Sequence, residues 1–153
     1  MARESSVLLD EIGRNLLAVL QEDARLPFAE IGRRIGLSPA ATAERLRRLE
    51  EVGVITGYRV ELDRDALGLP ILAIVRMSCD GAKYHPFLKA VKGLENVVEC
   101  HHVAGGDAFI LKVVAASVVE LERLVEKLLD FGVPTTSIVF SSPVERKALR
   151  VGS

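Results

Sequence analysis

Five arginines lie close together in the first third of the sequence, and their side chains could do the most specific chemistry in the chain. They are Arg33, Arg34, Arg45, Arg47 and Arg48. Between Arg33 and Arg48 only Glu44 is acidic, so five cations against one anion leave a local charge of +4. A guanidinium group donates paired N–H groups that match phosphate oxygens and the edge of guanine. This window therefore predicts a nucleic-acid contact, although the net charge of the whole chain is −1.

Three short helices must position these arginines. The first is indicated by apolar residues at helical spacing over 9–23, and the second by the stretch PFAEIGRRIG at 27–36. Gly36 can enter the left-handed conformation that ends a helix. Ser38 can then cap a third helix, in which Pro39 takes the first position. Two helices joined by so short a turn predict a helix-turn-helix, whose second helix enters the major groove of DNA.

The third helix has distinct inner and outer sides. Its inner side carries Thr42, Leu46, Leu49 and Val52. An arginine face paired with neighbouring glutamates is the alternative for an ordinary amphipathic helix, but the helix-turn-helix context favours DNA. We expect DNA contacts from Arg33, Arg34, Ser38, Ala40, Ala41, Glu44, Arg45, Arg47 and Arg48. The stretch VITGYRVEL after Gly53 predicts two short strands, which would form a wing.

The second half of the chain predicts a βαββαβ unit. Strands are expected at 70–79, 96–103, 107–115 and 134–144, and helices at 84–94 and 117–132. Ser117 and Glu120 form a capping box for the second of these helices, and Gly132 is expected to end it. The fold class is therefore α+β, with a helix-turn-helix domain at 1–60, a hinged linker at 61–69 and a ferredoxin-like domain at 70–153.

The sheet of this second domain reads as apolar on both faces. Phe109, Leu111 and Val113 alternate with Ile110 and Val114, and the strand at 70–79 behaves in the same way. Since both helices of such a unit cover one face, the other face must find another partner. We therefore expect a homodimer formed through the C-terminal domain.

The stretch LSPAATAERLRRLEEVGVITGY resembles the helix-turn-helix signature of the Lrp/AsnC (feast/famine) transcriptional regulators. The matching positions are Leu37-Ser38, Arg45, Arg48-Leu49-Glu50, Gly53-Val54-Ile55 and Gly57-Tyr58. The resemblance extends over nearly the whole chain, with Gly13, Pro27 and Thr42 as departures from the usual residues. It implies dimers that join into octamers or related rings and bind amino acids between them.

The stretch VAGGDAF at 103–109 has two interpretations. Taken alone, Gly105-Gly106 between two strands predicts a hairpin turn that needs no ligand. The family resemblance instead places the effector loop here, where glycine N–H groups can bind a carboxylate and an acid or hydroxyl can bind an amine. The candidates for effector binding are Ala104, Gly105, Gly106, Asp107 and Thr136, and the family often has an acid where Ala108 stands.

His101 and His102 invite a metal or catalytic interpretation. Adjacent residues of a strand point to opposite faces, so the two cannot share one ion, and Cys100 with His102 gives too few ligands. We expect no metal, catalytic residue or resident cofactor. The leading hypothesis is a sequence-specific transcriptional regulator that binds double-stranded DNA and responds to an amino acid or related metabolite. The alternatives are a siroheme-decarboxylase-like enzyme on the same architecture and an architectural DNA-wrapping protein. With no apolar run near membrane-spanning length, the expected location is the cytoplasm, at the nucleoid.

Overall fold

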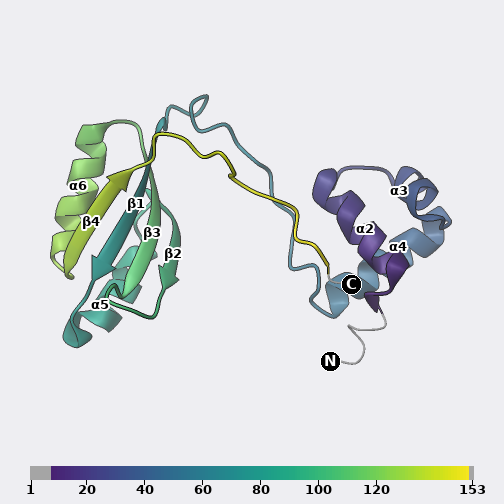
Figure 1. Ribbon diagram of the computed structural model, residues 1–153, viewed down its shortest axis with the longest axis horizontal. Coiled ribbons are helices and arrows are strands. Elements are labelled where there is room, and N and C mark those ends of the chain that lie inside the picture. The colour runs from purple at the N-terminus through teal and green to yellow at the C-terminus, as the bar shows by residue number, and fades with distance from the viewer. Residues whose placement is uncertain (1–7, 152–153) are drawn as a thin grey trace. The chain divides into compact units, whose positions relative to one another are not determined.

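The computed structural model describes residues 8–151, which form two compact units (Figure 1). One unit combines the chain up to Val60 with the segment from Val144 onward, and the other is Glu61–Pro143. The sequence-based division assigned everything after residue 70 to the second domain, so the structure differs at the C-terminal segment. That segment joins the first unit because the Gln21 side chain bonds to the Leu149 backbone and Val151 packs on the first unit's core.

The described part of the first unit contains helices α2 (Glu11–Glu22), α3 (Phe28–Ile35) and α4 (Pro39–Glu51). Their apolar faces meet in one small core of Leu16, Leu17, Ile31, Ile35 and Leu49. Asp10 caps α2 by accepting a hydrogen bond from the Gly13 N–H at 2.8 Å. Pro27 precedes α3 with no side-chain cap.

The turn between α3 and α4 confirms the predicted helix-turn-helix. Gly36 is left-handed at φ 76°, and the Ser38 hydroxyl accepts from the Ala41 N–H at 3.2 Å at the start of α4. Gly32, buried where α3 meets this turn, allows close contact with it. A Cβ at Gly32 would lie only 2.4 Å from the Leu37 carbonyl oxygen. The geometry of the turn therefore depends on two glycines.

The predicted wing is wrong for this chain. Residues 53–62 contain no strand in the described structure. The Val54 and Ile55 N–H groups both turn back to the Leu49 carbonyl, at 2.9 and 3.1 Å, and residues 57–62 are exposed. A β-prone segment without a neighbouring strand has no partner for its ladder, so local propensity alone does not produce a hairpin.

The second unit confirms the predicted βαββαβ order. Its elements are β1 (Ile71–Ser78), α5 (Gly81–Val91), β2 (Val97–His102), β3 (Phe109–Ala115), α6 (Val118–Leu129) and β4 (Val133–Ile138). The strands form one antiparallel sheet in the order β2-β3-β1-β4. Phe87 of α5 and Leu128 of α6 share a core with Val75 and Leu111 of the sheet, so both helices cover the same face.

The bounds of several elements differ from their predictions: α5, expected at 84–94, is found at Gly81–Val91, and α6 and β4 both end early. Helix α6 begins with the predicted capping box, in which the Glu120 N–H donates to the Ser117 hydroxyl at 3.2 Å, but it ends at Leu129. Gly132 does not end the helix. It allows close approach to β1, because a Cβ there would lie 2.1 Å from the Ser78 carbonyl oxygen. Strand β4 ends at Ile138, well before residue 144, although the Val139 N–H still donates to the Leu72 carbonyl of β1 at 2.8 Å.

The open face of the sheet is less apolar than β1 and β3 alone predicted. Ile74 and Ile110 are half-buried and supply apolar surface, whereas Leu72 and Val114 on the same face are buried. Strand β2 adds Glu99 and His101, and the Lys112 ammonium lies 3.2 Å from a Glu99 oxygen. The face therefore combines an apolar region with a charged one. Across residues 8–151, no helix is long and apolar enough to cross a bilayer.

Candidate nucleic-acid interface and ligand loop

Helix α4 exposes the side that the sequence predicted to meet DNA. Thr42 and Leu49 are fully buried on its inner side, and the Thr42 hydroxyl donates to the Ser38 carbonyl at 2.9 Å. This bond satisfies the hydroxyl of a threonine that is buried in the core. The exposed residues of the region include Arg33, Arg34, Ser38, Ala40, Ala41, Arg47 and Arg48. One continuous turn and helix therefore bring most of the predicted DNA-binding residues together.

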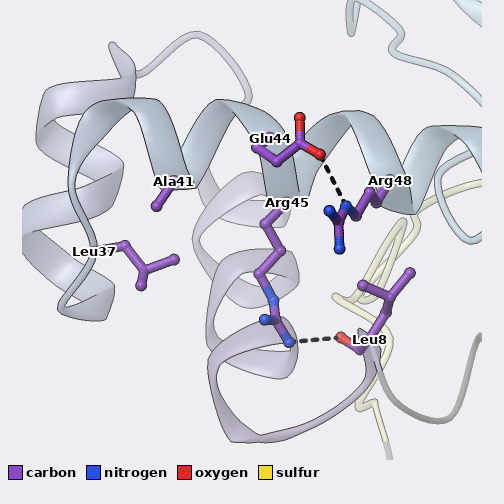
Figure 2. A pocket seen from close by; sticks show the side chains of 6 residues that line it. All are labelled: Leu8, Leu37, Ala41, Glu44, Arg45 and Arg48. Carbon is purple, nitrogen blue, oxygen red and sulfur yellow. Dashed lines mark hydrogen bonds and ion pairs between the residues drawn. The ribbon is translucent and has the colours of Figure 1, made fainter.

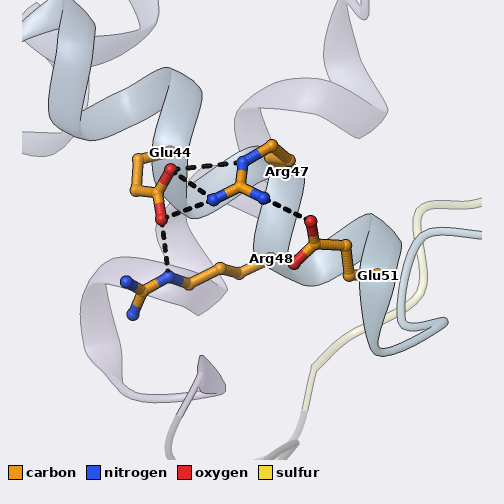
Figure 3. Close-up of polar contacts among 4 residues, drawn as sticks. All are labelled: Glu44, Arg47, Arg48 and Glu51. Carbon is orange, nitrogen blue, oxygen red and sulfur yellow. Dashed lines mark hydrogen bonds and ion pairs between the residues drawn. The ribbon is translucent and has the colours of Figure 1, made fainter.

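Glu44 sits between two of the exposed arginines (Figure 3). Its carboxylate accepts from Arg47 Nη2 at 2.7 Å and from Arg48 Nε at 2.9 Å. Arg47 Nε also donates to it at 3.2 Å, and Arg47 Nη1 pairs with Glu51. The hydrogen bonds from Arg47 and Arg48 lower the pKa of Glu44, so this carboxylate is charged at neutral pH.

Glu30 on α3 likewise pairs with two exposed arginines, and these contacts were not predicted from the sequence. Arg33 donates to both of its oxygens at 2.8 and 2.9 Å, and Arg34 Nε donates at 2.8 Å. These bonds, Arg33 first, lower the pKa of Glu30 to about 2. The signal was present, because residues three and four apart on a helix are neighbours. The alternative considered from the sequence, arginines paired with neighbouring glutamates, is thus found on the same surface that carries the predicted DNA-binding residues.

Arg45 lies differently from the other arginines. Its guanidinium turns toward the start of α2, where it pairs with Asp10. It also donates to the Leu8 carbonyl at 3.4 Å, as Figure 2 shows. Its side chain is 21% exposed, against 60% for Arg48. A Cβ on Gly13 would lie 1.8 Å from that same Leu8 oxygen, so only glycine at this position avoids a clash with the carbonyl. Arg45 therefore braces α4 against the segment before α2.

An open hollow runs beside α4 next to Arg45 and is shown in Figure 2. Its volume is about 210 Å³, and it is lined by Leu8, Leu37, Ala41, Glu44, Arg45 and Arg48. The leucine and alanine side chains offer apolar surface beside a guanidinium. Apolar contact suits the methyl group of thymine, whereas a guanidinium suits guanine, so this surface has the chemistry for direct base contacts.

The loop between β2 and β3 forms the predicted turn. The Val103 N–H donates to the Ala108 carbonyl at 3.1 Å, and Gly105 has a positive φ of 130°. Asp107 lies 3.9 Å from Arg76 Nη1 on β1, a residue that the sequence analysis did not consider. Its signal was a lone arginine in an otherwise apolar strand. Together the loop and Arg76 offer backbone N–H groups, a carboxylate and a cation, which are the groups that bind an amino acid.

Thr136 stands apart from that loop within one chain. It pairs with Val75 across β4 and β1, so its side chain lies on the helix-covered face, whereas Arg76 lies on the open face. Its hydroxyl oxygen is buried and has no hydrogen-bond partner among the described residues. The structure brings Ala104, Gly105, Gly106 and Asp107 together but leaves Thr136 on the other side of the sheet.

The two histidines occupy different environments. His101 lies on the open face, with Nε2 3.2 Å from Glu99, while His102 lies beside Tyr84 and Phe109 on the other face. Among residues 8–151, no group of three or more His, Cys, Asp or Glu side chains is placed to hold a metal ion.

Comparison with known proteins covers both units. An AsnC-type helix-turn-helix domain matches residues 9–50, and an Lrp/AsnC ligand binding domain matches residues 72–149. The HTH-type transcriptional regulator LrpC of Bacillus subtilis is 36% identical over 133 residues, covering 87% of this chain and 92% of LrpC. The leucine-responsive regulatory protein of Haemophilus influenzae is 34% identical over 127 residues, covering 81% and 76% of the two chains.

Solved structures agree with these matches. The structure of B. subtilis LrpC superimposes with a TM-score of 0.85 at 34% identity, covering 90% of this chain and 98% of LrpC. A feast or famine regulatory protein from M. tuberculosis, complexed with L-methionine, gives a TM-score of 0.84 at 29% identity, covering 92% and 99%. Both domains, in the same order and over nearly their whole length, identify this chain as a member of the Lrp/AsnC family of DNA-binding transcriptional regulators.

Proposed function

We propose that this regulator binds a specific double-stranded DNA site through the turn and outer face of α4, with α3 against the backbone. Arg33, Arg34, Arg47 and Arg48 would supply phosphate and base contacts, and Ala40 and Ala41 would let the helix approach the base edges. Arg45 would contribute by holding α4 in place. The observation that carries this proposal is the exposure of these residues on one capped helix-turn-helix.

Fluorescence anisotropy tests it. The full chain is titrated against a DNA fragment from upstream of its own coding region and against a shuffled control, over a salt series. We expect discrimination of at least about 10³-fold and an affinity that falls as salt rises. Equal binding to both fragments would favour the architectural alternative. Absence of binding to either would overturn the proposal and direct attention to tetrapyrrole binding at His101 and His102.

We propose an amino acid or a closely related metabolite as the effector, bound at the loop of 104–107. The support is the set of groups gathered there: glycine N–H groups, the Asp107 carboxylate and the Arg76 guanidinium. A structural neighbour complexed with L-methionine makes that amino acid the first to test. Since Thr136 lies on the other face of the sheet, a site that contains it as well would be completed by a second subunit.

We also propose a homodimer through the second unit, assembling further to an octamer or a similar ring. The apolar part of the open sheet face, which includes Ile74 and Ile110, supports such an interface. A dimer would present two α4 helices to half-sites about one DNA turn apart. Light scattering with and without L-methionine and DNA measures the assembly, and identical mass and DNA affinity in every condition would contradict effector control. The proposed place of action is the nucleoid in the cytoplasm.

A further inference from the structure

The arginines of the DNA-facing surface are not equivalent in the free protein. Arg47 is fully engaged: Nε and Nη2 bind Glu44, and Nη1 pairs with Glu51. Arg48 is held through Nε alone, at 2.9 Å from Glu44, and no contact of its two terminal nitrogens is found in the described residues. One carboxylate thus occupies one arginine's donors and leaves the other's terminal pair available (Figure 3).

This difference matters because phosphate and guanine make different demands. A phosphate binds the paired donors of a guanidinium just as a carboxylate does, so Glu44 already occupies on Arg47 the donors that DNA phosphate would use. Guanine O6 and N7 accept from a pair of arginine donors. With Nε fixed from behind, Arg48 keeps its outer pair for such an edge and loses little side-chain entropy when it binds.

We propose that Glu44 is a positioning residue that sets DNA specificity: it withholds Arg47 from the phosphates of arbitrary DNA and aims the terminal nitrogens of Arg48 at a guanine. The inference rests on the proposed function of α4. The negative charge of Glu44 also repels every backbone phosphate. A favourable guanine contact can outweigh this repulsion only at the cognate site. Glu30 holds Arg33 in the same paired geometry on α3.

The test compares Glu44→Gln with Glu50→Gln in the full chain. Both variants remove one charge from α4, but Glu50 accepts from the Tyr58 hydroxyl at 2.8 Å and pairs with no arginine in the described structure. Anisotropy titrations on the cognate fragment and on shuffled DNA, at several salt concentrations, give the specificity ratio and the salt slope. The wild-type chain in the same titrations tests the proposed function separately.

For Glu44→Gln we expect tighter binding to shuffled DNA, a log–log salt slope steeper by about 0.9, and a specificity ratio lowered about fivefold or more. Glu50→Gln should show a smaller change on each measure. In an Arg47→Gln background, Glu44→Gln should no longer steepen the slope on shuffled DNA, because the released phosphate contact is Arg47's. If Glu44→Gln matches Glu50→Gln, or keeps its full slope change without Arg47, the proposal is overturned. Failure of the wild-type chain to bind DNA would instead overturn the function on which it rests.

Discussion

The side-chain amide of Gln21 hydrogen-bonds to the backbone of Leu149 in both directions. Its Nε2 donates to the Leu149 carbonyl at 3.1 Å, and its Oε1 accepts from the Leu149 N–H at 2.7 Å. The two residues are 128 positions apart in the sequence. The pairing copies the way two strand backbones recognise one another, and it ties the C-terminal segment to α2.

Replacing Gln21 with alanine removes both of these bonds. We expect the Leu149 amide to exchange with deuterium faster and the segment from Val144 to detach more often. The free energy that holds this segment to the first unit should fall by about 1 kcal/mol. Gln21→Glu is the matched variant, since it can still accept from the Leu149 N–H. Hydrogen exchange followed by NMR measures the effect, and equal protection of Leu149 in Gln21→Ala and the wild type would show that the contact is absent in solution.

Gly32→Ala should disrupt the turn that positions α4. The new Cβ would lie 2.4 Å from the Leu37 carbonyl oxygen and 2.9 Å from the Thr42 hydroxyl oxygen, so the backbone must move. We expect a loss of about 1–3 kcal/mol in the free energy of unfolding, together with weaker DNA binding. Urea titration and anisotropy measure the two effects. Gly81→Ala, where no atom lies within 4 Å of the new Cβ, is the control and should be tolerated.

Arg45→Ala and Arg48→Ala should separate support from DNA contact. Arg45 pairs with Asp10 and is mostly buried, so its loss should lower both the melting temperature and the DNA affinity. Arg48 is 60% exposed, so its loss should lower affinity with little effect on melting. Circular dichroism melts and anisotropy on the same preparations decide the matter. An Arg45→Ala chain that melts like the wild type would refute the bracing role.

The contact of Glu30 with its two arginines predicts a specific acid sensitivity. The arginines lower the pKa of Glu30 from 4.5 to about 2. A depressed carboxyl pKa stabilises the fold fully above the unfolded value and loses that effect as pH falls toward the folded value. The stability difference between the wild type and Glu30→Gln should therefore shrink between about pH 5 and pH 2.

Urea unfolding at several pH values between 2 and 7 provides the comparison. Glu50→Gln serves as the charge-matched control, because it removes no arginine contact found in the described residues. A difference between the wild type and Glu30→Gln that stays constant across this range would contradict the expectation. The loss of such an exposed pair is small, since solvent screens it.

Thr136→Val tests the candidate effector residue that lies on the opposite face of the sheet from Arg76. Its buried hydroxyl oxygen has no partner in the described structure, so an isosteric methyl group should leave the unliganded chain equally stable or slightly more stable. If Thr136 binds the effector, the variant should lose its thermal shift with L-methionine. A full shift in Thr136→Val, alongside a lost shift in Asp107→Asn, would remove Thr136 from the site and keep the loop.

Local signals in the sequence predicted the helix-turn-helix and the order of strands and helices correctly. Ser38, Gly36 and the capping box at Ser117 each determine structure within a few residues, so pattern is enough. The wing failed because VITGYRVEL has strand propensity but no neighbouring strand to pair with. Gly132 failed as a helix end because its role is a contact with Ser78, which is distant in the sequence.

The sequence predicted which residues belong to the candidate sites, but not which of their side chains contact one another. The sequence indicated which residues face outward on α4, because helical periodicity determines that. It did not show that Arg45 turns toward Asp10, or that Asp107 lies by Arg76, since both pairs join segments far apart in the chain. It also did not show that the tail contacts the first unit, because a glutamine on α2 carries no sign of a partner at Leu149.

The return of the chain from the second unit to the first has a consequence for biosynthesis. Domains of a growing polypeptide generally fold in order as they emerge from the ribosome. Here the ribosome makes all of Glu61–Pro143 before it makes the residues that complete the DNA-binding unit. The surface that receives Leu149 and Val151 therefore stays uncovered until synthesis has passed the whole ligand-binding unit, while the core of Leu16, Ile31 and Leu49 comes entirely from residues made earlier.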